Sequence, residues 1–147
     1  ADAELAAVTD AVPAAAAALA AETGAKATST EAILSDAGID AILICTPTDT
    51  HADLIEAAVS AGKAVFCEKP VDLDAARIRR CLATVEASGR PLMIGFNRRF
   101  DPSFAALERR LRAGEAGAVE IVSVISRDPS PPPVEDVKRS GGLLRAM

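Results

Sequence analysis

The sequence has few of the features that mark secreted, membrane-bound or nucleic-acid-binding proteins. Its three cysteines are an odd number, widely spaced and set in apolar runs, which disfavours a disulfide framework and predicts buried free thiols in a reducing compartment. No apolar run approaches the length of a membrane span, and the first residues lack the basic and apolar regions of a secretory signal. We therefore expect a cytoplasmic protein without a membrane partner.

Basic charge is also in short supply. The chain carries 16 Lys and Arg against 21 Asp and Glu, a net charge of -5 that is spread along the sequence. This balance argues against a nucleic-acid partner and favours a small molecule. Half of the 147 residues are hydrophobic, which is enough for one domain with a real core.

Apolar runs alternate with helical patterns along the chain. The runs at 4–10, 39–45, 64–68 and 90–96 predict strands, and the run at 39–45 is apolar almost throughout, as in a strand covered on both faces. Pro13 suits a first helical turn and Gly24 the position after the last. Thr28 and Glu31 have the spacing of a capping box for a short helix that would stop at Gly38. Further helices are expected over 50–62, 72–89 and 101–114.

This alternation predicts parallel strands joined by right-handed helical crossovers, an α/β doubly wound sheet. In that architecture ligands bind beyond the carboxyl ends of the strands. After Gly117 a β-branched run is followed by "PSPPP", which forms neither helix nor central strand. We therefore expect a domain over residues 1–117 and the beginning of a second over 118–147.

Polar residues follow the predicted strands where ligands would bind. The first strand ends in Asp10, the second in "CTPTDTH" and the third in "CEKP", and all three are expected to meet at one crevice. An acid at the position of Asp10 accepts hydrogen bonds from the adenosine ribose of a dinucleotide and favours NAD over NADP. The local sequence fits a helix cap before Pro13 equally well.

The glycine-rich turn that cradles a pyrophosphate is missing. It should precede such an acid by about twenty residues, and the chain contains no G-x-G. Either the first strand, the glycine turn and the first helix are not part of this sequence, or the site does not bind a dinucleotide. The chain begins with Ala1, which is consistent with a segment missing before it.

Several motifs together resemble one known family. The stretch "AILICTPTDTHADLIEAAVSAGKAVFCEKPVDLD" looks like the core signature of the glucose-fructose oxidoreductase and inositol dehydrogenase family, in which a strand ending T-P-x-x-x-H is followed by a helix and a strand ending E-K-P. "GFNRRFDPSF" is similar to the segment after the next strand of that family. "ISRDPSPPP" and "RSGGLLRAM" resemble the beginning of its substrate domain, most closely in inositol 2-dehydrogenases, so the chain is expected to be truncated at both ends relative to the family.

The resemblance implies a fold and a set of roles. It implies a Rossmann-type NAD(P)-binding domain, here without its first strand, turn and helix, followed by an α/β domain that binds a sugar or polyol and often forms the interface of a homo-oligomer, a dimer or tetramer. NAD is the expected cofactor, NADP is less favoured, and no metal is expected. The implied roles are cofactor binding for Asp10, Cys45, Thr46, Pro47, His51, Glu68 and Lys69, catalysis for Lys69, and substrate contacts for Lys69, Arg127 and Asp128.

Lys69 carries the implied chemistry. Oxidising a carbinol moves a hydride to the nicotinamide and releases a hydroxyl proton, so a polar group must accept or relay that proton. A lysine at a crowded strand end meets this need, and Pro70 would follow a cis peptide bond that aims it inward. His51, in a first helical turn, is interpreted as a structural hydrogen-bonding or cofactor-packing residue rather than a base.

Two alternatives to catalysis stay open. On spacing alone, Glu68 and Lys69 fit an exposed pair at a strand end. The family's catalytic histidine lies in a later D-x-x-x-H segment, but the chain stops at Met147 and Ala146 stands where the aspartate is expected. The competing hypothesis is therefore a non-catalytic nucleotide- or partner-binding module derived from this family.

Overall fold

A computed structural model of the protein describes residues 3–125, 127, 130 and 134. Short strands and helices alternate along these residues. The strands are β1 (Ala7–Val8), β2 (Lys26–Ala27), β3 (Ala41–Ile44), β4 (Ala64–Cys67) and β5 (Leu92–Ile94). The helices are α1 (Pro13–Thr23), α2 (Thr30–Ser35), α3 (His51–Ser60), α4 (Ala75–Ser88) and α5 (Pro102–Arg112), with 3-10 turns at Thr48–Thr50 (η1) and Asn97–Phe100 (η2).

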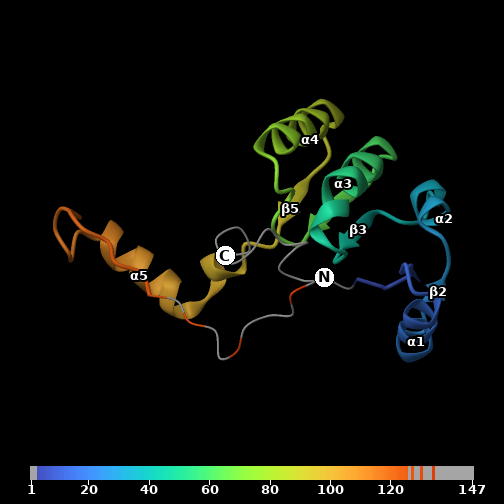
Figure 1. Ribbon diagram of the computed structural model, residues 1–147, viewed down its shortest axis with the longest axis horizontal. Helices are drawn as coiled ribbons and strands as arrows, with labels where there is room; N and C mark the ends of the chain where they lie inside the picture. Colours follow the sequence, from blue (N-terminus) through green and yellow to red (C-terminus); the bar gives the residue numbers. More distant parts are fainter. Residues whose placement is uncertain (1–2, 126, 128–129, 131–133, 135–147) are drawn as a thin grey trace.

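All strand pairs in the described residues are parallel, which confirms the α/β fold. β1 pairs with β2, and β3, β4 and β5 form a second sheet in that order. Parallel neighbours need a crossover connection, and each pair has a helix between its strands. Figure 1 shows β1 and β2 beside α1 and α2, on one side of the sheet that carries α3 and α4.

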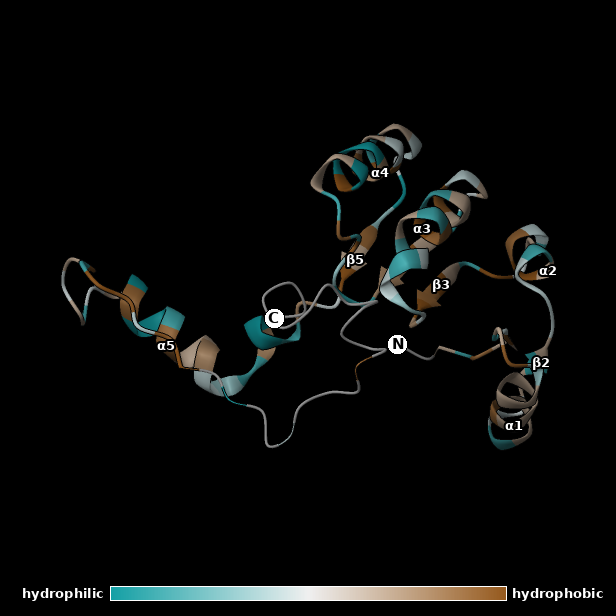
Figure 2. Ribbon diagram, viewed as in Figure 1, coloured by the Kyte–Doolittle hydropathy of each residue, from teal (hydrophilic) through white to brown (hydrophobic). Residues whose placement is uncertain are grey.

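The main core lies between the second sheet and the helices α3 and α4. Ile55 of α3 and the thiols of Cys67 and Cys81 have no exposed surface. Ile44 on β3, Val65 on β4 and several residues of α3 complete this cluster. A smaller cluster of Val8, Ala16 and Ala25 holds β1 and β2 against α1. Figure 2 shows apolar positions of α3 and α4 turned toward the strands.

The prediction that the strand at 39–45 is covered on both faces is wrong for the described residues. Leu43 of β3 pairs in register with Phe66 of β4, and Phe66 with Met93 of β5, so the three form a row across one face of the sheet. Leu43 is 69% and Met93 50% exposed. The helices α3 and α4 both cover the opposite face, which leaves this row open (Figure 1).

Most predicted helix ends are confirmed. Pro13 begins α1, and Gly24 follows it in the left-handed conformation at φ 79°. Asp101, which the sequence predicts as a cap, caps α5 by accepting from Ser103 N and Phe104 N. Asp74, for which no role was predicted, caps α4 by accepting a hydrogen bond from Ala76 N.

The capping box at Thr28 and Glu31 is wrong by one residue. Ser29 is the N-cap of α2, because its Oγ accepts from Ala32 N at 3.2 Å. Thr28 instead continues the ladder of β2, since its N–H donates to Val8 O. The strand β2 itself was missed, because only two residues pair and neither is buried. The helix ends at Ser35, well before Gly38.

A buried lysine fixes the turn between α2 and β3. Lys63 precedes β4, is 5% exposed, and donates from Nζ to the backbone oxygens of Asp36 and Ile39, the second at 2.8 Å. An ammonium group is costly to bury unless its protons are bonded. These bonds satisfy that requirement and join the α2–β3 turn to the start of β4.

The chain beyond β5 leaves the core. α5 projects away from the rest of the fold (Figure 1), with Arg98 stacked over the Phe104 ring at 5.7 Å. Residues 113–125 contain no helix or strand, and the β-branched run at 118–125 is exposed. A domain boundary near Gly117 stays a prediction.

Replacing Ile55 with alanine tests the core. We expect Ile55→Ala to lower the free energy of unfolding by about 2–5 kcal/mol, because it empties a fully enclosed site. Leu82→Ala, at a 40% exposed position of α4, is the matched control and should cost about 1 kcal/mol or less. Urea titration followed by far-UV circular dichroism measures both, and equal losses would contradict the assigned core.

Candidate functional site at the strand ends

The carboxyl ends of β3 and β4 lie side by side. Ile44 pairs with Cys67 at the last position of both strands, and Glu68 N donates to Ile44 O at 2.9 Å. The chain therefore delivers Thr46 and Pro47 from one strand, and Glu68 and Lys69 from the next, to one edge of the sheet. This is the edge at which ligands bind in open α/β sheets.

His51 joins these two strand ends. It begins α3, is 1% exposed, and lies between the backbone oxygen of Thr46, 2.7 Å from Nε2, and that of Pro70, 2.7 Å from Nδ1. The interpretation of His51 as a structural or cofactor-packing residue stays a prediction, and these contacts support the structural part of it, because both ring nitrogens face backbone oxygens. The ring holds the Thr46–Pro47 turn against the segment that follows Lys69.

Glu68 is placed by the next strand. A methyl group on Gly95, just after β5, would lie 3.2 Å from both carboxylate oxygens of Glu68, so the carboxylate rests against the glycine backbone. Gly95 N donates to Cys67 O at 2.8 Å, and Lys69 N donates to the Glu68 carboxylate at 3.2 Å. The site is therefore built from the ends of three neighbouring strands.

The peptide bond between Lys69 and Pro70 is cis, as predicted from the sequence. Lys69 is partly buried. Thr46 and Pro47 are exposed, and the Thr46 hydroxyl lies 2.7 Å from that of Thr50. The arrangement leaves polar groups of Thr46 and Lys69 at an accessible edge, with an apolar core behind them.

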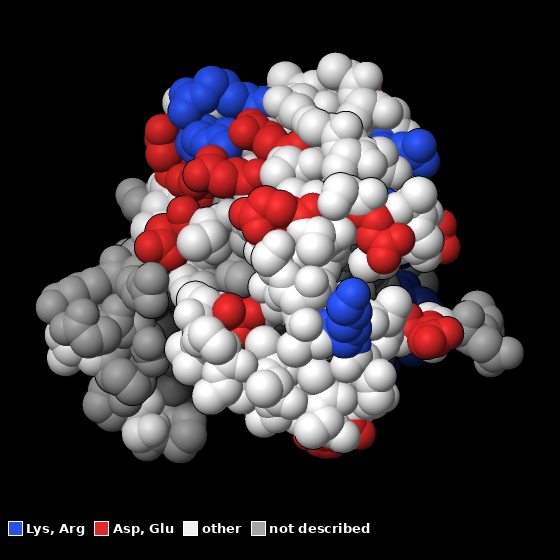
Figure 3. Space-filling view, turned by 90° about the vertical axis from the view of Figure 1, so that its right-hand side faces the viewer, with Lys and Arg blue, Asp and Glu red and all other residues white. Residues whose placement is uncertain are grey.

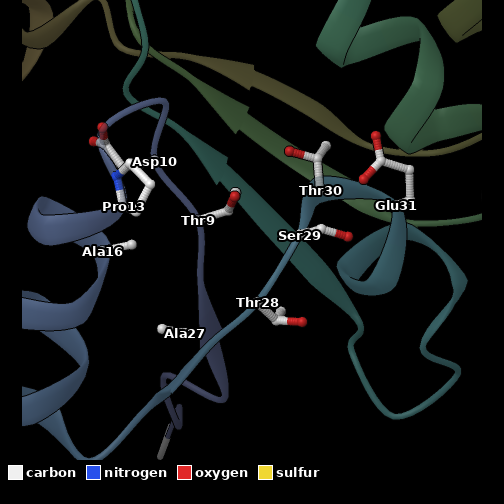
Figure 4. Close-up of a pocket in the computed structure, with 9 residues that line it drawn as sticks. All are labelled: Thr9, Asp10, Pro13, Ala16, Ala27, Thr28, Ser29, Thr30 and Glu31. Atoms are coloured by element: carbon white, nitrogen blue, oxygen red, sulfur yellow. The ribbon is translucent and has the colours of Figure 1, made fainter.

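Asp10 lines a separate, open pocket of about 520 Å³ between α1 and α2. Figure 4 shows Asp10 and Pro13 on one side of it, Thr28 and Ser29 along the chain that leaves β2, and Glu31 at the far side. Asp10 accepts from Val12 N at 2.7 Å, so the carboxylate shapes the turn before α1, whose N-cap is Val12. Asp10 is therefore not the helix cap that the local sequence also allowed.

The candidate residues fall on two parts of the described fold. Thr46, Pro47, Glu68 and Lys69 share the edge of the second sheet, whereas the residues that line the Asp10 pocket come from β1, α1 and the β2–α2 segment. That the two parts face one crevice stays a prediction. Of the predicted substrate contacts, Arg127 is exposed and Asp128 lies outside the described residues.

The prediction of three buried thiols is wrong for one of them. Cys45 is exposed because it stands just beyond β3, while Cys67 and Cys81 are buried, and all three are free. Burial raises the pKa of Cys67 to about 12, with the neighbouring Cys45 as the next contribution. Cys67 is therefore an unreactive core residue, as its sequence context indicated.

Two searches of the described residues gave negative results. No group of three or more His, Cys, Asp or Glu side chains is arranged to hold a metal ion. Among the same residues, no helix combines the length and the apolar character needed to cross a membrane.

Sequence reasoning missed several residues of these sites. Of the pocket residues, Thr28 and Glu31 were predicted only as a capping pair and Ser29 was given no role, because β2 was not recognised. Neither Gly95 nor Lys63 belongs to a motif with a predicted role. Gly95 contributed only to the resemblance of the segment after β5, whereas the structure places the Glu68 carboxylate against it.

Parallel strands joined by helices, with polar side chains at the carboxyl ends of the strands, are typical of proteins with a Rossmann-type nucleotide-binding fold. Comparison with known proteins specifies the family. Residues 1–96 match the GFO_IDH_MocA family, described as an oxidoreductase family with an NAD-binding Rossmann fold. The chain belongs to this family.

Relatives and solved structures agree with that assignment. The chain is 57% identical to an inositol 2-dehydrogenase from Rhizobium meliloti (strain 1021), over all of this chain and 44% of that protein. A solved structure from Sinorhizobium meliloti 1021 matches with a TM-score of 0.92 and 57% identity, over 100% of this chain and 45% of the other. The scyllo-inositol dehydrogenase of Lactobacillus casei, solved with NAD(H) and scyllo-inositol, matches with a TM-score of 0.72 and 33% identity, over 77% of this chain and 34% of the other. The chain therefore spans less than half the length of these relatives.

Removing the His51 ring tests its structural role. We expect His51→Leu to lower the free energy of unfolding by about 1–3 kcal/mol, because a backbone oxygen at one of the two ring contacts loses its hydrogen-bond donor. Ser60→Ala, at the exposed end of the same helix, is the control. If chemical denaturation shows the same change for both variants, the ring does not hold the two segments together.

Thiol reactivity tests the burial of the cysteines. We expect iodoacetamide to modify Cys45 readily in the native protein, while Cys67 and Cys81 react only after unfolding, because burial raises the pKa of both thiols. Peptide mass spectrometry measures the modified fraction at each site. Cys45→Ser should remove the fast reaction, and fast modification of Cys67 would contradict the described packing.

Proposed function

We propose that this chain belongs to an NAD-dependent dehydrogenase that oxidises a carbinol of an inositol or related polyol. The observation that carries the proposal is the meeting of the T-P-x-x-x-H and E-K-P segments at one sheet edge, held together by His51. Family membership and the similarity to named inositol dehydrogenases support it.

The residues present fit an NAD molecule. Asp10 offers a carboxylate oxygen to a ribose at the pocket beside α1, and no Lys or Arg lines this pocket to attract a further phosphate. Cys45, Thr46 and Pro47 would line the cleft at the end of β3. His51 would contribute indirectly, because its ring holds this turn through the backbone oxygen of Thr46. Glu68 and Lys69 would lie beside the nicotinamide.

The proposed mechanism rests on Lys69. Bound NAD supplies the acceptor for the substrate hydride. Lys69 donates or accepts a hydrogen bond at the reacting hydroxyl and relays its proton away from the carbinol oxygen. The His51 bridge fixes the backbone next to Lys69, and the apolar core lies beneath the strand ends. Arg127 and Asp128 are proposed polyol contacts.

The organisation of the whole protein is part of the proposal. Residues 1–117 form the nucleotide-binding domain, and residues 118–147 begin a substrate domain that also mediates homo-oligomer formation in the cytoplasm. The loss of regular structure after α5 in residues 113–125 supports this division. The row of Leu43, Phe66 and Met93, in which Leu43 and Met93 are exposed and Phe66 is partly buried, supports further contacts of the nucleotide-binding domain.

A non-catalytic nucleotide- or partner-binding module is the second candidate function. The observation that favours it is the engagement of His51, the single histidine of this sequence, whose two ring nitrogens both face backbone oxygens and so do not assist Lys69 in proton transfer. Calorimetry with NAD⁺ and absorbance of reduced nicotinamide with a panel of inositols and sugars separate the two. Binding of NAD⁺ without turnover supports the module. If the chain shows no NAD⁺ binding and no turnover, the dehydrogenase proposal is excluded for this chain.

Replacing Lys69 tests the catalytic assignment. We expect Lys69→Ala to lower the turnover of the preferred polyol at least about a hundredfold, the low end for a positioned proton-transfer group. NAD⁺ affinity should change far less, because the adenosine pocket is separate. Lys26→Ala, at an exposed position of β2, is the matched control. An unchanged rate in the Lys69 variant would refute its role.

A further inference from the structure

The pocket that contains Asp10 has a second carboxylate. Glu31, in the first turn of α2, lines it together with Asp10, and the remaining lining residues are uncharged. Figure 4 shows Asp10 and Glu31 on opposite sides, with Thr9, Ser29 and Thr30 between them. Both charged groups at this pocket are therefore acidic, although they come from segments about twenty residues apart in the sequence.

The Glu31 carboxylate is exposed and ionised at neutral pH. Its own backbone N–H and the Ser29 hydroxyl lower its pKa. Ser29 is fixed in turn, because its Oγ accepts from Ala32 N. The exposed carboxylate lies beside the chain that leaves β2, where it adds negative charge to the pocket that it lines.

The wider surface carries charges of both signs. Figure 3 views the molecule from the side of α1 and α2, where Asp and Glu side chains lie across the middle of the face, with Lys and Arg gathered above them and a further basic side chain below the centre. A phosphate monoester carries about -1.5 to -2 charges at neutral pH. Such a group entering the pocket meets two carboxylates and no lining cation.

We propose that Glu31 is a specificity-determining residue, which acts with Asp10 to exclude adenosine ribose that carries a 2′-phosphate. This inference rests on the proposed function, since it assumes that the pocket binds the adenosine half of NAD. Asp10 offers direct hydrogen bonds to a free ribose, whereas Glu31 acts by repulsion through space. Its effect is therefore on NADP⁺ and is screened by salt.

The test compares both nucleotides in three exposed-site variants. We expect Glu31→Gln to tighten NADP⁺ binding about threefold or more at low salt, with NAD⁺ affinity unchanged, because one repulsive charge is removed. Glu31→Asp keeps the charge and should behave like the wild type. Glu22→Gln, at the end of α1 and outside the pocket, removes the same charge elsewhere and should also leave the preference unchanged.

Calorimetry at low and high salt gives the ratio of the two dissociation constants. An increase in the NADP⁺ affinity of Glu31→Gln that becomes smaller at high salt supports the inference. If NAD⁺ binds and the ratio of the NAD⁺ and NADP⁺ dissociation constants is the same in Glu31→Gln and in the wild type, the inference about Glu31 is overturned and the proposed function stands. Adenosine 5′-monophosphate and adenosine 2′,5′-bisphosphate probe the pocket alone, and no binding of any of the four nucleotides to the wild type overturns both.

Discussion

The in-register pairing of β3 and β4 is the constraint on which the candidate site depends. Because Ile44 and Cys67 are partners at the last position of their strands, the two polar segments that follow emerge at one edge. The core between the strands, α3 and α4 keeps that register, since a one-residue shift would turn Ile44 and Cys67 away from it. His51 then fixes the segments beyond the strands, where the ladder no longer acts. Core packing therefore determines where the strand ends lie, and the His51 contacts determine how the Thr46 and Pro70 segments lie relative to each other.

Ion pairs strengthen this arrangement from outside the core. Arg77 of α4 reaches both Asp53 and Glu56 of α3, with its Nη1 2.6 Å from Glu56 Oε1. The two helices are therefore linked at their outer surface as well as through Ile55 and Cys81 beneath. Since α3 begins with His51 and Asp53 lies in its first turn, these ion pairs hold the end of the helix that contacts the strand-end turns. The site is supported by the whole of this layer rather than by its loops alone.

The sequence predicted the elements whose signals are local. Proline and aspartate at helix starts, and glycine after α1 and α4, each act through one or two hydrogen bonds or through φ, so the pattern alone locates them. The alternation of apolar runs also predicted the parallel sheet. The roles of Lys69 and its neighbours came from a resemblance, because an acid and a base at a strand end are in themselves ordinary.

Other features escaped prediction because distant contacts decide them. The strand β2 has two exposed residues and exists because it pairs with β1. Cys45 and Leu43 occupy apolar runs, yet the described residues do not cover them. The Asp10 pocket joins segments on either side of α1, and Lys63 finds its oxygens more than twenty residues away. No local pattern encodes such partners.

The contact between Gly95 and Glu68 makes two strand ends mutually dependent. Gly95 does not adopt a left-handed backbone, so its own conformation does not require glycine. The restriction comes from the carboxylate on the adjacent strand, 3.2 Å from where a methyl carbon would sit. Side-chain size at position 95 is therefore coupled to side-chain length at position 68. In evolutionary terms the pair should covary, with a larger residue at one position compatible only with a shorter or displaced one at the other.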